Sequence, residues 1–213
     1  MLIDYICKLI PNITAYLGGK LYSFIDFLNR IRLKPKYRCI ISNNCNGGLI
    51  CKALRIRYNS PTVGLSILIK DIITALNDYD YFFVDNKYNL KEIDSAEEYP
   101  VGIWADKIVV RFIHYDSFDE AYKTWCRRID RLEKDSLYIL LTCTEDYWDD
   151  SDLKRFQELE YKNKVLLTNK PYSISDTFYI RGNENKQGIM LACKRRVILR
   201  YIDQFDYVNF LNK

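Results

Sequence analysis

The residues best suited to chemistry lie in one short stretch, where an apolar run gives way to small and amide-bearing residues. Residues 39–41 predict a buried strand, and residues 42–48, Ser-Asn-Asn-Cys-Asn-Gly-Gly, predict a tight turn into a helix over residues 49–54. Ligands of open α/β sheets bind at the carboxyl ends of strands, and the N–H groups that begin a helix favour anions. Asn43, Asn44, Gly47 and Gly48 are therefore candidate substrate-binding residues. The alternative is a turn whose glycines only meet steric demands.

Two further polar clusters follow predicted strands. His114 is the single histidine and ends a strand expected over residues 107–114, where a neutral imidazole can accept a proton from a substrate hydroxyl. Asp146 follows a strand expected over residues 137–142, as a candidate base or a ligand for Mg²⁺ or Mn²⁺ beside a diphosphate. The alternatives are a histidine that caps the next helix and, for the acids at residues 149–152, the solvated first turn of a helix.

A third candidate group lies on the helix expected over residues 118–133. Arg127 shares a face with Arg131, so two guanidinium groups could clamp a phosphate. Ion pairs with neighbouring acids would explain the arginines equally well. Cys45 is the one thiol at the predicted site, but no histidine or aspartate pairing is visible in the sequence, which favours a structural role over a nucleophilic one.

Several of these motifs together resemble a bacterial family encoded among capsule and exopolysaccharide genes. The matching motifs run in the family's order from about residue 38 to residue 168: Ile41-Ser42-Asn43-Asn44-Cys45 with Gly47-Gly48, Tyr58, Ser60-Pro61-Thr62-Val63-Gly64-Leu65, Tyr99-Pro100-Val101-Gly102, His114 to Ala121, Trp125 with Arg127-Arg128, and Tyr161-Lys162-Asn163-Lys164. The family usually carries Trp where this chain has Asn46, so an aromatic stacking role is not carried over to that position.

The resemblance implies an exopolysaccharide or capsule biosynthesis protein, most concretely a glycosyltransferase with a nucleotide-sugar donor and a glycan acceptor. Ser60 and Thr62 of the second motif then join the expected substrate-binding residues. The Gly47-Gly48 loop and Arg127 would hold the donor diphosphate, and His114 or Asp146 would deprotonate the acceptor hydroxyl. Two other functions stay open: transfer of a non-sugar group to the polysaccharide, and a non-catalytic module that binds glycan or partner proteins.

Composition narrows the class of protein. The 213 residues suit one globular domain at residues 35–213, because 48% are hydrophobic and 28% are charged. A net charge of +4 is too small for the basic face of a nucleic-acid binder. Seven scattered cysteines without a Cys-x-x-Cys pair fit a reducing cytoplasm, and a single histidine argues against a zinc site.

Residues 1–34 form a separate segment with helical periodicity. Its apolar residues recur near the helical period, but no run approaches the roughly 18 residues of a membrane span, and the early Asp4 does not suit a signal peptide. Two interpretations remain: a helical hairpin packed on the domain, or an amphipathic segment over residues 1–33 that lies on the inner face of the membrane with help from the basic residues at 30–38.

The remaining sequence alternates between strand-like and helix-like segments. Strands are expected over residues 38–42, 81–84, 107–114, 137–142, 164–168 and 177–180, and helices over residues 49–54, 66–77, 118–133, 149–159 and 197–211. This alternation predicts an α/β fold, Rossmann-like, with a mainly parallel sheet and helices on both faces. The ends of the strands at 38–42, 107–114 and 137–142 are expected on one rim of that sheet.

Overall fold

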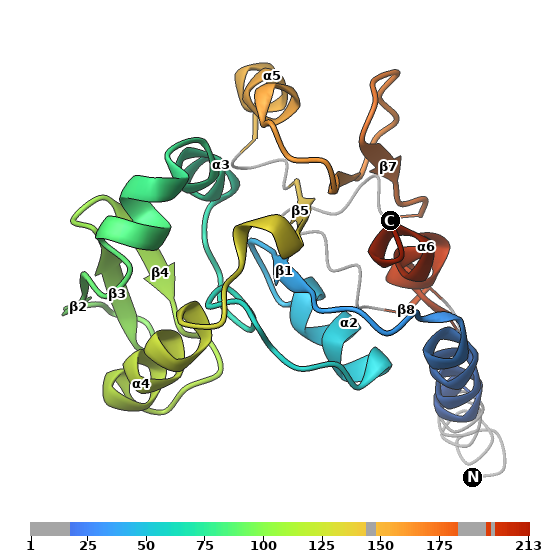
Figure 1. Ribbon diagram of the computed structural model, residues 1–213, viewed down its shortest axis with the longest axis horizontal. Coiled ribbons are helices and arrows are strands. Elements are labelled where there is room, and N and C mark those ends of the chain that lie inside the picture. Colours follow the sequence, from blue (N-terminus) through green and yellow to red (C-terminus); the bar gives the residue numbers. More distant parts are fainter. Residues whose placement is uncertain (1–17, 144–147, 183–194, 197–198) are drawn as a thin grey trace, which may run out of the picture.

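A four-stranded parallel sheet forms the centre of the computed structural model, which describes residues 18–143, 148–182, 195–196 and 199–213 (Figure 1). The strands lie in the order β1 (Cys39–Ile41), β5 (Leu137–Thr142), β6 (Lys164–Thr168) and β7 (Thr177–Tyr179). Every residue of the first three is buried, as strands covered on both faces should be. The expected parallel sheet is confirmed.

Helices cover both faces of this sheet. On one face, Ile139 and Leu166 join the core formed with α3 (Ile69–Asn77), α4 (Phe118–Ile129) and α5 (Asp150–Glu158). On the other, Leu140 and Leu167 join a second core with α2 (Asn46–Leu54) and α6 (Tyr207–Leu211). Successive strand residues point to opposite faces, so each strand contributes to both cores.

The strand expected at residues 107–114 exists but belongs to another sheet. β4 (Ile108–Arg111) pairs antiparallel with β3 (Val101–Trp104), which pairs antiparallel with β2 (Leu90–Ile93). This three-stranded sheet lies beside α4, apart from the parallel sheet (Figure 1). The expectation that all three site strands share one rim is therefore wrong for this strand.

Two other expected elements are also corrected. The strand expected at residues 81–84 is the π-helical η1 (Asp80–Asp85), in which Phe82 and Phe83 both pack edge-on against Trp104 at centroid distances of 5.1 and 5.0 Å. A short apolar run does not distinguish a buried strand from a buried helix. In place of one helix over residues 197–211, the structure has β9 (Leu199–Arg200), then η4 (Tyr201–Gln204) and then α6. β9 pairs antiparallel with β8 (Arg195–Arg196).

Helix boundaries differ by a few residues elsewhere. α2 begins three residues earlier than expected, so Asn46, Gly47 and Gly48 form its first turn. α3 begins at Ile69 because Ser66 instead forms a β-bridge with Arg111. α4 ends at Ile129, and the short η2 (Lys134–Ser136) precedes β5.

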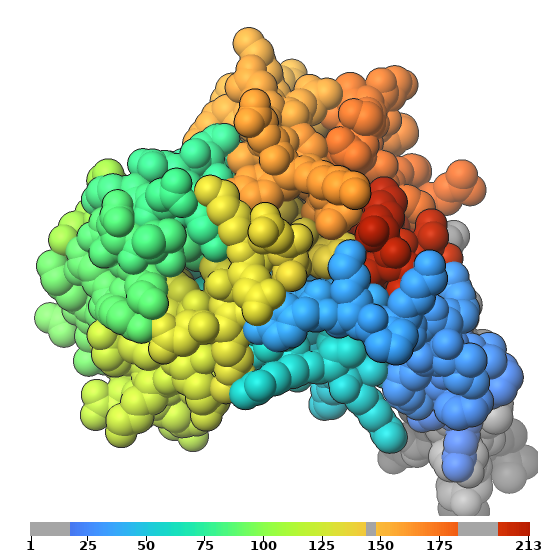
Figure 2. Space-filling view, in the orientation of Figure 1, coloured from blue at the N-terminus to red at the C-terminus, as the bar shows by residue number. Residues whose placement is uncertain are grey.

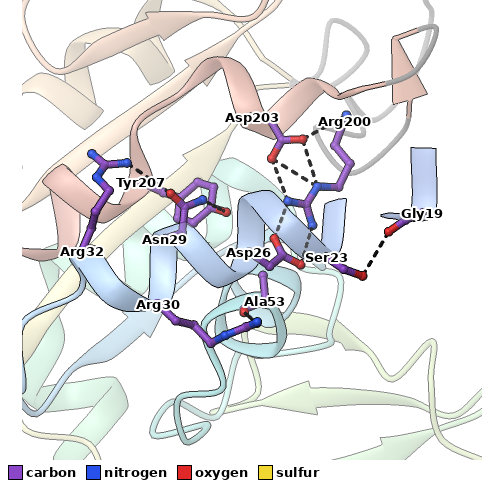
Figure 3. Close-up of polar contacts among 10 residues, drawn as sticks. All are labelled: Gly19, Ser23, Asp26, Asn29, Arg30, Arg32, Ala53, Arg200, Asp203 and Tyr207. Atoms are coloured by element: carbon purple, nitrogen blue, oxygen red, sulfur yellow. Dashed lines mark hydrogen bonds and ion pairs between the residues drawn. The ribbon is translucent and has the colours of Figure 1, made fainter. Parts of the chain in front are cut away.

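A helix at residues 18–32 packs on the C-terminal part of the chain through one face. Arg200 donates to Asp26 at 2.6 Å and to Asp203 at 2.8 Å, and Asn29 donates to the Tyr207 hydroxyl at 2.8 Å (Figure 3). The helix extends from the body of the molecule, next to α6 (Figure 2). Among the described residues, no helix combines the length and hydropathy that a membrane span requires.

Candidate functional site

A pocket of about 460 Å³ opens where β1 ends and α2 begins. It is lined by the first turns of α2, by the loop before α3, by the turn after β4 and by α4. Both sheets therefore contribute to the pocket. β1 of the parallel sheet is followed by α2, and β4 of the antiparallel sheet is followed by the turn that contains His114 and Tyr115.

The closest pair of reactive groups in this pocket is Cys45 and His114. The Cys45 Sγ lies 3.2 Å from the His114 Nε2, across 69 residues of sequence. Cys45 is half-buried at the N-cap of α2, and His114 is exposed in the turn after β4. The partner that the sequence did not show for Cys45 is thus supplied by the fold. Thiol and imidazole in hydrogen-bonding contact are the pairing that enzymes use to activate a cysteine nucleophile.

Buried amides hold the loop that carries Cys45. The Asn43 side chain donates to the Thr142 carbonyl at 3.0 Å and accepts from the Thr142 N–H at 2.9 Å. Asn46 donates to the Thr142 hydroxyl at 2.9 Å, while its own N–H donates to the Asn44 side chain at 3.0 Å. Asn43 and Asn44, predicted to bind substrate, are both buried in this network: Asn43 fixes the loop to the end of β5, and Asn44 bonds within the loop.

The two glycines of the loop have different surroundings. A Cβ on Gly47 would lie 2.5 Å from the Ser42 Oγ, so Gly47 allows close packing against β1. Gly48 lines the pocket, and a Cβ there would lie 3.1 Å from the Val63 Cγ1. Only the second glycine is in a position to contact a ligand.

The second predicted motif lies behind the pocket. Ser60 and Thr62 are completely buried and hydrogen-bond to each other at 3.0 Å, and the Thr62 hydroxyl accepts from the Ser42 N–H at 3.1 Å. Their contacts connect the loop before α3 to the end of β1. The structure therefore brings His114, Gly48 and Arg127 together in the pocket and places Asn43, Asn44, Gly47, Ser60 and Thr62 in its support.

The pocket carries an excess of positive charge. Lys52 and Arg127 line it and are exposed, and Arg127 has no ion pair with any residue that the structure describes. Arg128 donates to the Val63 carbonyl at 2.7 Å and lies over the Tyr58 ring at 5.1 Å from the ring centroid. Burial, followed by the charges of Arg57 and Arg127, lowers the pKa of Arg131 on the neighbouring turn.

The N-terminus of α2 adds to this field. Cys45 makes no side-chain capping bond to the helix, and the first turn contains no acidic residue. The first N–H groups of a helix lack intrahelical partners and carry partial positive charge. With two exposed cationic side chains beside it, this end of α2 suits a phosphate or diphosphate.

The acidic residues after β5 divide into two groups. Asp149 caps α5 by accepting from the N–H groups of Ser151 at 2.8 Å and Asp152 at 3.0 Å, and hydrogen bonds from Ser151 lower the pKa of its carboxyl. This matches the alternative of a helix first turn. Asp146 lies outside the described residues, and those residues contain no group of three His, Cys, Asp or Glu side chains placed to hold a metal ion.

Comparison with known proteins places the chain in a family. Residues 18–212 match a family model described as a domain of unknown function, DUF1919. An uncharacterized protein of Haemophilus influenzae is 34% identical over 192 residues, a match that covers 87% of this chain and 91% of that relative. Because the match spans nearly the whole chain, the pocket and its supporting network lie inside the shared region. The chain belongs to the DUF1919 family.

Proposed function

We propose that this protein is a transferase of cell-surface polysaccharide assembly, and specifically a glycosyltransferase that moves a sugar from a nucleotide-sugar donor to a glycan acceptor. The observation that carries the proposal is the pocket itself, which combines the His114 imidazole with Lys52, Arg127 and the first turn of α2, whose N-cap residue makes no side-chain capping bond. The likeness of its sequence motifs to those of exopolysaccharide proteins supports the choice of substrate class.

In this mechanism the donor diphosphate binds against Gly48, Lys52 and Arg127, where positive charge is already in place. His114 takes the proton of the acceptor hydroxyl as that oxygen bonds to the anomeric carbon of the sugar. The bond from that carbon to the diphosphate breaks, and the nucleoside diphosphate leaves with its negative charge neutralised. The strand ends of β1 and β5 would play the part that strand ends play in Rossmann-like donor sites.

A thermal-shift screen tests this proposal. Nucleotide sugars, with and without Mg²⁺ or Mn²⁺, should raise the unfolding temperature of the wild-type protein, because a ligand that binds only the folded state stabilises it. Arg127→Gln should lose most of that shift. Lys70→Gln removes an exposed cation from α3, outside the pocket, and should keep it. Glycan binding without any donor binding would instead identify a non-catalytic module.

One observation favours a second candidate, the transfer of a non-sugar group. Proton abstraction from an acceptor hydroxyl requires a base but no thiol, whereas acyl transfer commonly proceeds through a cysteine nucleophile. The 3.2 Å contact between Cys45 and His114 is the arrangement that such a reaction requires.

We also propose that the protein works in the cytoplasm and contacts the inner face of the membrane through its N-terminal helix. The face of residues 18–32 turned away from Arg200 and Tyr207 is apolar and exposed, with Phe24 at 58% and Ile31 at 67%. The other exposed apolar residues of this face are Leu21, Phe27 and Leu28. The exposed Lys20 and Lys34 flank it and suit anionic lipids.

Sedimentation with vesicles that contain phosphatidylserine tests the membrane contact. The double variant Phe24→Ser, Ile31→Ser should stay in the supernatant while the wild type sediments. Val84→Ser is a matched control, because Val84 is 54% exposed but lies on η1. Point variants are preferable to deletion of the helix, which would leave Arg200 without Asp26. Equal sedimentation of all variants would contradict the proposal.

A further inference from the structure

We propose that Cys45 is a nucleophile which, with His114 as its base, carries an acyl group as a thioester on the way to a polysaccharide hydroxyl. This inference rests on the second candidate function of the pocket, transfer of a non-sugar group, and names its covalent step. The donor would be an acyl thioester of a phosphate-bearing thiol carrier, since the same cationic groups that suit a diphosphate suit the phosphates of such a carrier.

The position of Cys45 separates it from the other thiols that the structure describes. Cys45 and Cys126 are both half-buried, but Cys45 contacts an imidazole, whereas Cys126 lies in the last turn of α4, where burial raises its thiol pKa. Cys39 and Cys51 are buried in the core, and desolvation raises their pKa values to about 11 and about 12. Reactive cysteines lie at helix N-termini or beside histidine, and Cys45 does both.

The helix also serves the proposed intermediate. Attack on a thioester carbonyl places negative charge on the carbonyl oxygen, and backbone N–H groups stabilise such an oxyanion. The first-turn N–H groups of a helix point toward its N-cap residue, which in α2 is Cys45. Gly48 follows in this first turn and lines the pocket, so no side chain of its own separates a ligand from the backbone there.

The proposed reaction has two balanced steps. In the first, the Cys45 proton passes to His114, the sulfur bonds to the acyl carbon, and the bond from that carbon to the carrier sulfur breaks. The carrier thiolate takes the proton from His114 and leaves. In the second, His114 removes the proton of the acceptor hydroxyl, the hydroxyl oxygen bonds to the acyl carbon, the bond to the Cys45 sulfur breaks, and the thiolate regains the proton.

Two measurements on the full chain test the nucleophile. In limited iodoacetamide with peptide mapping, Cys45 should be alkylated faster than Cys126, which is the matched half-buried control. His114→Gln keeps an amide nitrogen near the position of Nε2 but removes the base, and it should slow alkylation of Cys45 without changing Cys126. Equal rates at the two cysteines, or no effect of His114→Gln on folded protein, would overturn the proposal.

Acetyl-coenzyme A then serves as the probe of the covalent step. The wild type should gain one acetyl group, located at Cys45 by peptide mass and released by neutral hydroxylamine, and folded Cys45→Ser should gain none. His114→Gln should acquire it more slowly, by a factor on the order of 10² or more. Acetylation that persists in Cys45→Ser, or its absence from the wild type, would overturn the acyl-carrier step.

These outcomes are separate from those of the nucleotide-sugar screen. Stabilisation by a nucleotide sugar with an unreactive Cys45 would leave the glycosyltransferase proposal standing and overturn this one. Acetylation of Cys45 without any stabilisation by a nucleotide sugar would support the acyl-transfer proposal and overturn the glycosyltransferase proposal. If neither effect is seen, the pocket has no transferase role.

Discussion

Two pockets of opposite charge share one loop of the molecule. The segment after β4 contributes His114 and Tyr115 to the basic pocket and then Asp116 to Asp119 to a second pocket of about 590 Å³. The acidic residues that line the second pocket are Glu92, Asp94, Glu97, Glu98, Asp116 and Asp119. The two pockets therefore differ in charge, although the same loop helps to form both.

Their supports differ as well. The basic pocket rests on buried polar residues that connect it to the sheet, notably Asn43, Ser60 and Thr62. The acidic pocket is lined mostly by exposed loop residues between β2 and β3 and by the first turn of α4, where Asp119 complements the helix dipole. The larger pocket is thus the one with fewer buried polar contacts behind it. A positively charged wall supported by buried hydrogen bonds, more than volume, distinguishes the candidate site.

The comparison predicts a large difference between two neighbours on the shared loop. His114→Ala should lower turnover by a factor on the order of 10² to 10⁴, because it removes the proposed base. Asp116→Asn changes a residue of the acidic pocket and should leave turnover unchanged. Steady-state transfer assays, with donor binding checked by calorimetry, measure both. Full turnover in folded His114→Ala protein would shift the role of base to Asp146.

The supports can be compared by stability. Asn43→Ala leaves the Thr142 N–H and carbonyl without their side-chain partner inside the protein, and should cost about 2 to 4 kcal/mol of the free energy of unfolding. Glu97→Ala, in the exposed loop of the acidic pocket, should change it by no more than about 0.5 kcal/mol. Urea unfolding of both variants provides the measurement. Comparable losses would mean that the two pockets are equally well supported.

Within the basic pocket, the adjacent glycines should affect different properties. Gly47→Ala places a Cβ against Ser42 and should destabilise the fold by about 1 to 3 kcal/mol. Gly48→Val adds bulk to the pocket wall near Val63 and should abolish donor binding in a protein that still folds. Thermal unfolding and calorimetry separate the two effects. Normal donor affinity in Gly48→Val would remove the α2 N-terminus from the binding site.

The smallest expected effect is on the antiparallel sheet. The hydrogen bond from Lys91 lowers the pKa of Asp106 below its ordinary value of 3.8. The exposed pair therefore stabilises the fold at pH values above 3.8, and this stabilisation is lost as the pH falls through the lowered pKa. The stability of Asp106→Asn should fall slightly less than that of the wild type on acidification, as followed by thermal unfolding. A larger acid sensitivity in the variant would contradict this assignment.

The buried centre of the fold could be predicted from the sequence, and the site only in part. β5 and β6 begin and end at the expected residues, because their apolar runs are continuous where both faces of a strand are covered. The hairpin of β2 and β3 was missed, since Lys91 and Glu92 are exposed and interrupt any apolar pattern.

The pairing of Cys45 with His114 had no signal in the sequence. It depends on which sheet β4 joins, and strand propensity does not determine the partner of a strand. The polar residues 42–48 indicated a region that lines the candidate pocket at Cys45 and Gly48, but the separate positions of these residues required the structure. Polar side chains can hold a loop or face a ligand, and burial shows which they do: Asn43 and Thr62 are buried, whereas Arg127 is exposed.

The Asn43 side chain has one more consequence. Its amide bonds the backbone of Thr142 in both directions, as a neighbouring strand would, and so extends the pairing of β1 with β5 beyond the last backbone pair. The Thr142 amide proton can then exchange with solvent only when its hydrogen bond to Asn43 opens, and that opening removes one of the side-chain contacts that hold the Cys45 loop. The exchange rate of one backbone proton in β5 thus reports how often the Asn43 contact that holds the Cys45 loop opens.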